Sequence, residues 1–529
     1  MNGSRLIRLI TMAPLVAILA PSYASAALVT LTGKVTDAGG VGISGVQVNF
    51  VDSCTGVTAG ASGNTTSVTG SFSAVVNAGT YDLEFSPPAG TLFIAQRIKN
   101  FDLSASTTLA PVALPFGITV SGKITDGAGA AVSGVFLHFF PPGTNERVFT
   151  VRDKTDALGN YSVVVAPGTY NLHYGPPPGT RFTALARSSV SIPGNTTLPT
   201  VALQSGLLVT GTVFDSAAQG HPVINANIDA FDAVSGVELS LSHDRTDATG
   251  TYTVAVPPGN YVLDYKPEKC TLLVALASAP TAVSADLTLP RVSLAAGVLV
   301  QGLVTDTRGV PVDDVNTSYF GSSGLQVLTW NDHTDPTGAY SAVVLPGDTY
   351  SIDYAPPIAQ RLAGVRSTGI TISNNPPPLP TVMLPDGFFV TGRCVALGGA
   401  PVFDVDLGFF PAGTTTRTFV SHHHTDAAGN FTVVVVPGTY DIRFVPPTNT
   451  LAARRLFGIT VGADRALGNI LLEQGYTVTG TVTDSLGFPV DLADLDFFDF
   501  YTGEKVETPH DNTAPDGTYS VVEIGRAHV

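Results

Sequence analysis

Short runs in which apolar and polar residues alternate, separated by turn residues, make up most of the chain. In residues 160–166 the large apolar side chains fall on every second position. The same period of two returns in residues 169–175, after the turn residues Pro167 and Gly168. A period of two is typical of a β-strand with one buried face. The pattern therefore predicts a β-hairpin whose aromatic and aliphatic side chains enter a core.

The same alternation extends over residues 116–204. No segment of about ten residues in any part of the chain combines a helical period with helix caps. Seven short strands in about 90 residues, with turns every 8–12 residues, indicate a Greek-key β-sandwich of the immunoglobulin-like or prealbumin-like kind. The expected strands are 118–125, 132–141, 147–154, 160–166, 169–175, 182–192 and 197–203.

This pattern recurs along the chain, so the fold class that we predict is an all-β tandem array. A V-x-G or T-x-G start appears at Gly33, Gly122, Gly211, Gly302, Gly392 and Gly480, at spacings of 88 to 91 residues. A unit of this size can hold its own core, which indicates tandem domains rather than solenoid turns. The predicted repeats are 27–115, 116–204, 205–295, 296–385, 386–473 and an incomplete sixth, 474–529.

The motif T-D-x-x-G-x-[YF], followed by P-G-x-Y and P-P, stands almost unchanged at 155–177 and at 425–447. Asp at one position and Gly three residues later are the preferences of a type I turn. The aromatic residues alternate with polar ones and are expected in the core. These turn and core roles fall on Asp156, Gly159, Tyr161, Gly168 and Tyr170 in the second repeat and on Asp426, Gly429, Phe431, Gly438 and Tyr440 in the fifth.

Taken together, V-x-G-x-V-x-D-x-x-G-x-P-V, T-D-x-x-G-x-Y and P-G-x-Y resemble the carboxypeptidase regulatory-like domain. The resemblance covers five repeats and the first half of the sixth. It implies a transthyretin-like (prealbumin-like) sandwich, related in shape to starch-binding and other carbohydrate-binding folds. It also implies a non-catalytic accessory module, which is often found in tandem in exported bacterial proteins. The first repeat departs from the motif, because Ser67 stands where the turn Asp is expected.

Composition adds three constraints. Charged residues make up 13% of the chain and hydrophobic residues 44%, which is not the composition of a disordered protein. The formal net charge of −16 disfavours nucleic acid and anionic membrane surfaces as partners. Three cysteines, Cys54, Cys270 and Cys394, are too few for a disulfide framework.

The two ends of the chain carry their own signals. Arg5 and Arg8, the apolar run 9–20 and the small residues 24–26 fit a secretory signal peptide over 1–26. No later apolar run is long enough to span a bilayer, so we expect a secreted protein at an extracellular, cell-surface or periplasmic location. Residues 524–529 match the translation of a common sequencing adapter, so we expect the natural chain to continue beyond them.

Catalytic motifs are absent from the sequence. None of the ten histidines has Glu three residues later, and H-E-x-x-H, G-x-S-x-G, P-loop and Rossmann patterns do not occur. We therefore predict no enzyme, no catalytic residue and no bound cofactor.

Two clusters are candidate metal sites. On a strand, His422 and His424 would share one face and could hold a metal ion with a third group. The alternative is a solvated strand face, since the second repeat has Asp153 and Lys154 at the positions of His423 and His424. In the sixth repeat, four carboxylates leave a calcium site conceivable, although no known calcium-loop spacing is present; they are Asp491, Asp494, Asp496 and Asp499.

The leading hypothesis is a secreted, non-enzymatic structural or adhesion-type protein whose repeats act as a stalk or spacer. Its partners would be an extracellular polysaccharide or a surface protein. The alternative is polysaccharide binding, for which Trp330, the single tryptophan, is the stacking candidate. A more remote alternative is the accessory region of a larger exported enzyme.

Overall fold

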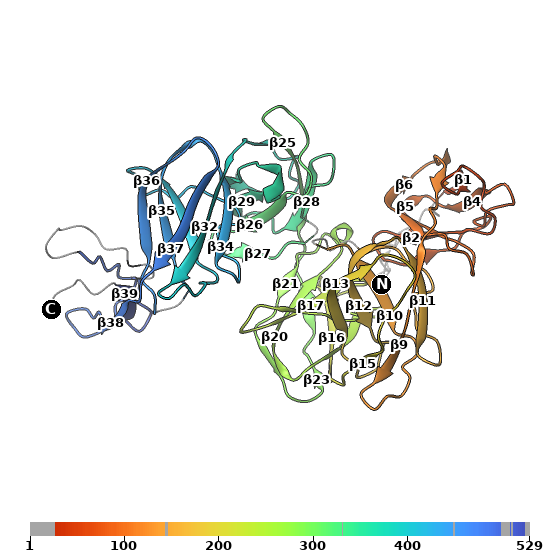
Figure 1. Ribbon diagram of the computed structural model, residues 1–529, viewed down its shortest axis with the longest axis horizontal. Coiled ribbons are helices and arrows are strands. Elements are labelled where there is room, and N and C mark those ends of the chain that lie inside the picture. The colour runs from red at the N-terminus through yellow and green to blue at the C-terminus, as the bar shows by residue number, and fades with distance from the viewer. Residues whose placement is uncertain are drawn as a thin grey trace, which may run out of the picture. The chain divides into compact units, whose positions relative to one another are not determined.

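The computed structural model describes residues 27–142, 147–330, 332–447, 450–498, 508 and 511–523. Over these residues the secondary structure consists of β-strands and two short 3-10 turns, which confirms the all-β class (Figure 1). The two turns are η1 (Lys269–Thr271) and η2 (Ile358–Gln360). The predicted signal peptide and residues 524–529 lie outside the described residues. Among those described, no helix is long and apolar enough to cross a membrane.

The chain forms two compact units, one ending at Gly206 and the other beginning at Leu207. The strands of the first unit are β1 (Leu28–Thr36), β2 (Gln47–Asp52), β3 (Thr58–Ala59), β4 (Ser71–Asn77), β5 (Gly79–Ser86), β6 (Gln96–Leu103), β7 (Thr107–Thr108), β8 (Val112–Ala113), β9 (Ile118–Asp126), β10 (Phe136–Phe140), β11 (Asn160–Val165), β12 (Gly168–Gly175), β13 (Leu185–Ile192), β14 (Thr196–Thr197) and β15 (Val201–Leu203).

The second unit holds the remaining strands. They are β16 (Leu207–Asp215), β17 (Asn227–Asp232), β18 (Glu238–Leu239), β19 (Thr251–Val256), β20 (Gly259–Lys266), β21 (Leu276–Ala277), β22 (Thr281–Val283), β23 (Leu287–Thr288), β24 (Val292–Leu294), β25 (Val298–Asp306), β26 (Asn316–Phe320), β27 (Gln326–Val327), β28 (Ala339–Val344), β29 (Thr349–Ala355), β30 (Val365–Thr371), β31 (Val382–Leu384), β32 (Phe388–Ala396), β33 (Asp406–Pro411), β34 (Asn430–Val435), β35 (Gly438–Val445), β36 (Arg454–Val461), β37 (Arg465–Leu472), β38 (Tyr476–Thr481) and β39 (Thr518–Glu523).

Two small sheets make up each of the first five repeats. In the second repeat, β9 pairs antiparallel with β11 and parallel with β14 and β15. The other sheet has the order β10-β12-β13 and is antiparallel. Because β9 and β10 follow each other in sequence but lie in different sheets, the chain crosses between two layers, as in a sandwich.

The third predicted strand of the second repeat is wrong. Over 147–154 the described backbone forms a single bridge, Phe136 to Lys154, instead of a strand. Arg152 has φ 54°, a left-handed conformation that interrupts extended backbone. The structure also divides the last predicted strand, 197–203, into β14 and β15.

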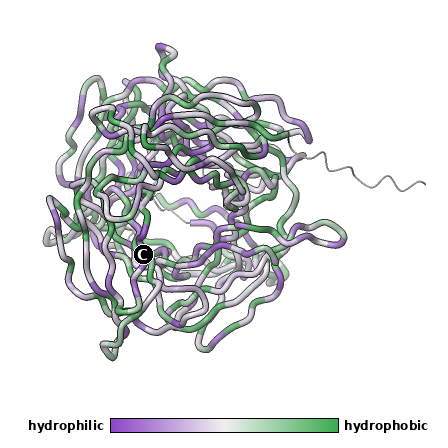
Figure 2. The backbone as a smooth tube through the Cα atoms, turned by 90° about the vertical axis from the view of Figure 1, so that its right-hand side faces the viewer, coloured by the Kyte–Doolittle hydropathy of each residue, from purple (hydrophilic) through white to green (hydrophobic). Residues whose placement is uncertain are grey.

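Five hydrophobic cores lie between these paired sheets, and each draws its residues from one repeat. In the second repeat the core runs from Val120 to Leu203 and includes Phe139 and Tyr174, both fully buried. Apolar and polar residues mix finely along the backbone, as Figure 2 shows by hydropathy. The other four cores span Val29–Leu114, Val209–Leu294, Val300–Leu384 and Val390–Leu472.

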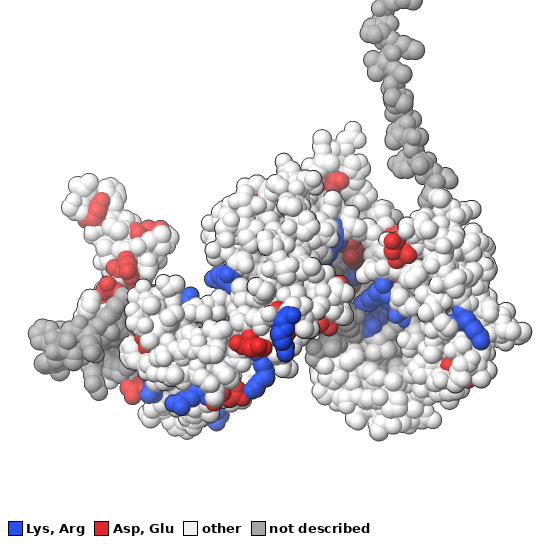
Figure 3. All heavy atoms as spheres, turned by 90° about the horizontal axis from the view of Figure 1, so that it is seen from above, with Lys and Arg blue, Asp and Glu red and all other residues white. Residues whose placement is uncertain are grey.

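Charged side chains are sparse on the surface. On the face seen in Figure 3, small groups of basic and acidic residues stand among large uncharged areas. The chain has 26 Lys and Arg residues and 42 Asp and Glu residues.

Candidate functional site

The repeated motif residues have structural contacts. The Asp156 Oδ1 atom accepts hydrogen bonds from the backbone N–H groups of Leu158 and Asn160, both at 2.8 Å. The bond from Asn160 is the main cause that lowers the pKa of Asp156. Gly159 has φ 77°, and a Cβ there would lie 2.3 Å from the Ile124 carbonyl oxygen. Asp426 makes the same two bonds in the fifth repeat, at 2.9 and 2.8 Å.

The motif aromatic residue covers the glycine that begins each repeat. Tyr161 on β11 lies directly opposite Gly122 on β9. A Cβ at Gly122 would lie 2.3 Å from the Tyr161 hydroxyl oxygen, so glycine leaves the space that the ring occupies. Phe431 fills the equivalent space over Gly392. The same pairing joins Gly33 to Phe72, Gly211 to Tyr252, Gly302 to Tyr340 and Gly480 to Tyr519.

The P-G-x-Y tyrosine closes the hairpin between β11 and β12. The Tyr170 hydroxyl donates a hydrogen bond to the Ala166 carbonyl at 2.8 Å, and Tyr440 donates to Val436 at 2.9 Å. Both rings are buried. The glycines of this motif, Gly168 and Gly438, begin β12 and β35 next to these rings.

Sequence reasoning missed the motif threonine. The buried Thr425 hydroxyl donates to the Val402 carbonyl at 2.8 Å and accepts from the Val405 N–H at 2.9 Å. A hydroxyl can make both bonds at once. The signal was its recurrence before Asp in most repeats. Equivalent pairs of bonds are made by Thr66, Thr155, Thr246, Thr334 and Thr513.

Neighbouring repeats are joined through the main chain. The Gly117 N–H of the second repeat donates to the Leu92 carbonyl of the first at 2.8 Å, and beside it, within the first repeat, the Ile94 N–H donates to the Pro115 carbonyl at 2.8 Å. The rings of Phe93 and Phe116 stack there with centroids 4.5 Å apart. The same two bonds recur at Val274–Ala295 and Gly297–Leu272, at Ala363–Pro385 and Gly387–Arg361, and at Ala452–Glu473 and Gly475–Thr450.

Side chains add to these junctions. The Trp330 Nε1–H donates to the Pro267 carbonyl at 2.6 Å, so the tryptophan bridges the third and fourth repeats. Lys269 lies at the same junction and donates to the Ser341 carbonyl at 2.6 Å and hydroxyl at 3.0 Å. Burial lowers the pKa of Lys269. The half-buried Trp330 is therefore a contact between repeats, which disfavours it as an open platform for sugars.

The junction between the fourth and fifth repeats carries an ion pair. Arg361 donates to the Asp464 carboxylate, and its guanidinium lies 4.2 Å from the centroid of the Phe389 ring. Both side chains of the pair are about half exposed. An ion pair with this exposure contributes little stability by itself.

The histidine cluster differs from its predicted arrangement. His422 has φ 57° and lies in a turn, so it does not share a strand face with His424. The structure instead groups His423 and His424 with Asp406, which begins β33; one ligand atom from each lies within 4.8 Å of the others. Three residues before the motif threonine, Gly63, Arg152 and His243 have a positive φ like that of His422.

Local contacts set the charges of this cluster. Burial lowers the pKa of both His422 and His423. Burial opposes ionisation of Asp406, but the hydrogen bonds and charge of Arg417 outweigh it and lower the pKa of this carboxyl. Arg417 donates to both Asp406 oxygens, at 2.9 and 2.5 Å.

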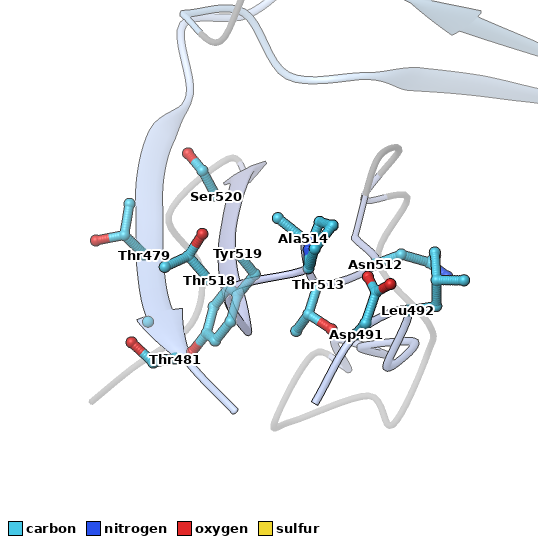
Figure 4. A pocket seen from close by; sticks show the side chains of 12 residues that line it. Thr479, Thr481, Asp491, Leu492, Asn512, Thr513, Ala514, Thr518, Tyr519 and Ser520 are labelled. Carbon is cyan, nitrogen blue, oxygen red and sulfur yellow. The ribbon is translucent and has the colours of Figure 1, made fainter. Parts of the chain in front are cut away.

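The acidic residues of the sixth repeat are only partly together. Asp494 and Asp496 group with Asp511, which is distant from them in sequence. Asp491 instead lines an open groove of about 920 Å³ beside β38 and β39 (Figure 4). Asp499 lies outside the described residues.

Comparisons with known proteins give a distant relative. No protein-family model matches the chain. It is 26% identical over 318 residues to the inverse autotransporter adhesin YeeJ of Escherichia coli (strain K12), a match to 54% of this chain and 13% of YeeJ. The chain thus spans about an eighth of the length of this relative.

Solved structures match at low similarity. The Bacillus anthracis TIE protein is 11% identical, with 68% of this chain and 67% of that chain covered and a TM-score of 0.15. The streptococcal ancillary pilin is 12% identical, with 51% and 99% covered and a TM-score of 0.17. The major pilin subunit BcpA of Bacillus cereus is 11% identical, with 51% and 99% covered and a TM-score of 0.14. TM-scores this low do not establish a shared arrangement over the whole chain.

Proposed function

We propose that this chain is an exported, non-enzymatic surface protein of adhesion type in which tandem sandwiches act as a stalk or spacer. One observation carries the proposal: at four junctions within the two units, the backbone N–H of the second residue of a repeat, always a glycine, donates a hydrogen bond to a carbonyl of the preceding repeat. A flexible linker would leave those backbone groups to solvent. Hydrogen bonds at fixed positions restrict bending between neighbouring repeats, as a spacer requires.

The match to an adhesin supports the same proposal. It covers 54% of the chain. The motif residues hold turns, core and junctions, which leaves them no role in catalysis. We further propose that residues 27–115, 116–204, 205–295, 296–385 and 386–473 are separate domains, between which limited proteolysis should cut first.

Small-angle X-ray scattering on the chain from residue 27 onwards tests the spacer function. Six modules of roughly 30 Å in line would reach about 180 Å, with a radius of gyration of roughly 50 Å. A compact protein of this length would have a radius of gyration of about 23 Å. A value near the compact limit, unchanged by salt, would refute the proposal.

Surface exposure needs a separate measurement. Antibodies against the purified chain should label intact cells that express the gene, and external protease should remove the label. Labelling that appears only after the cells are broken would contradict a surface location.

A further inference from the structure

The fifth repeat holds a group of metal-binding side chains on a backbone that is itself fixed. Asp406 and His424 face each other in a β-bridge, and the Leu407 N–H donates to the His423 carbonyl at 2.8 Å. Thr425, the residue after His424, is fixed by its two hydrogen bonds to the backbone of Val402 and Val405. Main-chain pairing therefore brings the three side chains together before any ligand binds.

His424 is oriented by a second partner. Its Nδ1 atom lies 2.8 Å from Asp404 Oδ1. A carboxylate only accepts hydrogen bonds, so a neutral His424 ring would carry its proton on Nδ1, toward Asp404, and leave a lone pair on Nε2. A second partner of this kind is typical of metal-bound histidines.

The ligand atoms of the cluster lie close together. The Nε2 atom of His423 lies 3.5 Å from Asp406 Oδ1, and the ligand atoms of all three residues fall within 4.8 Å of one another. Ligands around a transition ion lie about 2.0–2.2 Å from it. Small side-chain rotations bring these atoms to such distances.

The fourth repeat has an amide where the fifth repeat has the Asp406 carboxylate. There His333 Nδ1 lies 2.8 Å from Asp314 Oδ1, as His424 does from Asp404. The His333 Nε2, however, pairs with the Asn316 side-chain amide at 3.1 Å. In the fifth repeat Asp406 stands in place of this amide and has no proton to donate to a histidine, and it accepts hydrogen bonds from Arg417 instead. A carboxylate beside two imidazoles is a ligand set that a metal ion can use.

We propose that Asp406, His423 and His424 bind a divalent transition-metal ion such as Zn²⁺, with solvent completing the coordination. Two imidazole nitrogens and one carboxylate suit zinc, nickel or cobalt, whereas calcium and magnesium prefer oxygen ligands. The site goes beyond the spacer function and does not depend on it.

Arg417 competes for the same carboxylate. Its guanidinium donates to both Asp406 oxygens and also to the Leu407 carbonyl at 3.1 Å. An incoming ion would share these oxygens with the guanidinium and meet its positive charge. The competing charge weakens metal affinity, so Arg417→Ala should tighten binding about tenfold or more.

The test is calorimetric titration of ZnCl₂ into the chain from residue 27 onwards, purified without a histidine tag and freed of metal with a chelator. We expect one zinc ion per chain at this site. His424→Ala and Asp406→Asn should weaken binding about tenfold or more. His422→Asn is the matched control, because it removes the adjacent imidazole with a residue that tolerates the left-handed backbone, and it should bind as the parent does.

Further measurements keep the result decisive. Any binding of CaCl₂ or MgCl₂ should be the same in the parent and in His424→Ala. Cobalt bound at the site should give a d–d absorption band of the kind that four- or five-coordinate cobalt shows. If His424→Ala fails to fold, tighter binding by Arg417→Ala decides in favour of the site. No zinc binding by the parent, or equal binding by the parent, Arg417→Ala and the folded ligand variants, would overturn the proposal.

Discussion

At the scale of single residues, hydrogen-bond capacity explains why a residue type recurs. The buried Thr425 hydroxyl satisfies two backbone groups that have no water to replace it. Asp426 caps N–H groups at the surface of the same turn. The threonine therefore satisfies backbone groups on the buried side of the turn and the aspartate satisfies those on its exposed side. Only the aspartate belongs to the well-known turn preferences.

Thr425→Val should destabilise the fifth repeat. The substitution keeps the shape but leaves the Val402 carbonyl and the Val405 N–H unpaired and buried, at a cost of roughly 2–4 kcal/mol. The hydrogen-exchange rates of the protected backbone amides in 386–473 should then rise roughly 30-fold or more. Mass spectrometry of peptides from that repeat measures the change.

Two controls accompany this variant. Thr425→Ser keeps the hydroxyl and loses one methyl group, so it should cost only about 1 kcal/mol. Peptides from 116–204 report the unaltered second repeat in the same sample. If valine and serine were equal in effect, the hydroxyl would not be the stabilising group.

At the scale of elements, the pairing of strands gives meaning to distant motif residues. Gly122 and Tyr161 lie 39 positions apart, yet they face each other across β9 and β11. The ring packs over the glycine and fills the space that a side chain would take. The V-x-G and T-D-x-x-G-x-Y motifs are thus two halves of one contact.

Gly122→Ala should therefore disturb the second repeat. The new Cβ would lie 2.3 Å from the Tyr161 hydroxyl oxygen, and overpacking of this kind costs roughly 1–3 kcal/mol. Hydrogen exchange of peptides from 116–204 is the readout. Gly127→Ala is the matched control, since no atom lies within 4 Å of its added Cβ. Equal exchange rates in the two variants would contradict a stabilising role for the contact between Gly122 and Tyr161.

The same scale explains the wrong strand over 147–154. Alternation in the sequence favoured extended backbone there, whereas Arg152 takes a left-handed conformation. The side chain uses this turn to donate to the Pro87 carbonyl of the preceding repeat at 3.1 Å. Gly63, His243 and His422 take the same conformation at the equivalent positions, so the turn belongs to the repeated fold and overrides the local preference.

At the scale of the whole molecule, buried phenols tie stability to alkaline pH. Desolvation raises the pKa of Tyr161, Tyr252 and Tyr354 above the ordinary value, and burial raises that of the Cys394 thiol to about 12. Tyr340 and Tyr354 also share a hydrogen bond of 2.8 Å between their hydroxyls. In each repeat that holds such groups, the folded state disfavours their ionised form.

The sign of the effect follows from these shifts. Their folded pKa values lie above the unfolded ones, so the native state keeps protons that the unfolded state loses above about pH 10 for tyrosine. Stability is fully present below that pH and falls by about 1.4 kcal/mol per group for each pH unit above it. We expect cooperative unfolding between about pH 10 and 12, with tyrosinate absorbance and circular dichroism changing together. Tyrosines that titrate normally while the β-structure persists would show that they are not buried as described.

The local pattern was enough to predict the repeat, the all-β class and the hairpin, because alternation and turn chemistry act between residues a few positions apart. It could not decide which histidine joins His424, since that depends on a left-handed turn at His422 and on Asp406, eighteen positions before His424 and on another strand. Nor could it show that Trp330 bonds to Pro267 across a junction. These contacts join segments that are distant in sequence, and only the packing of sheets and repeats brings them together.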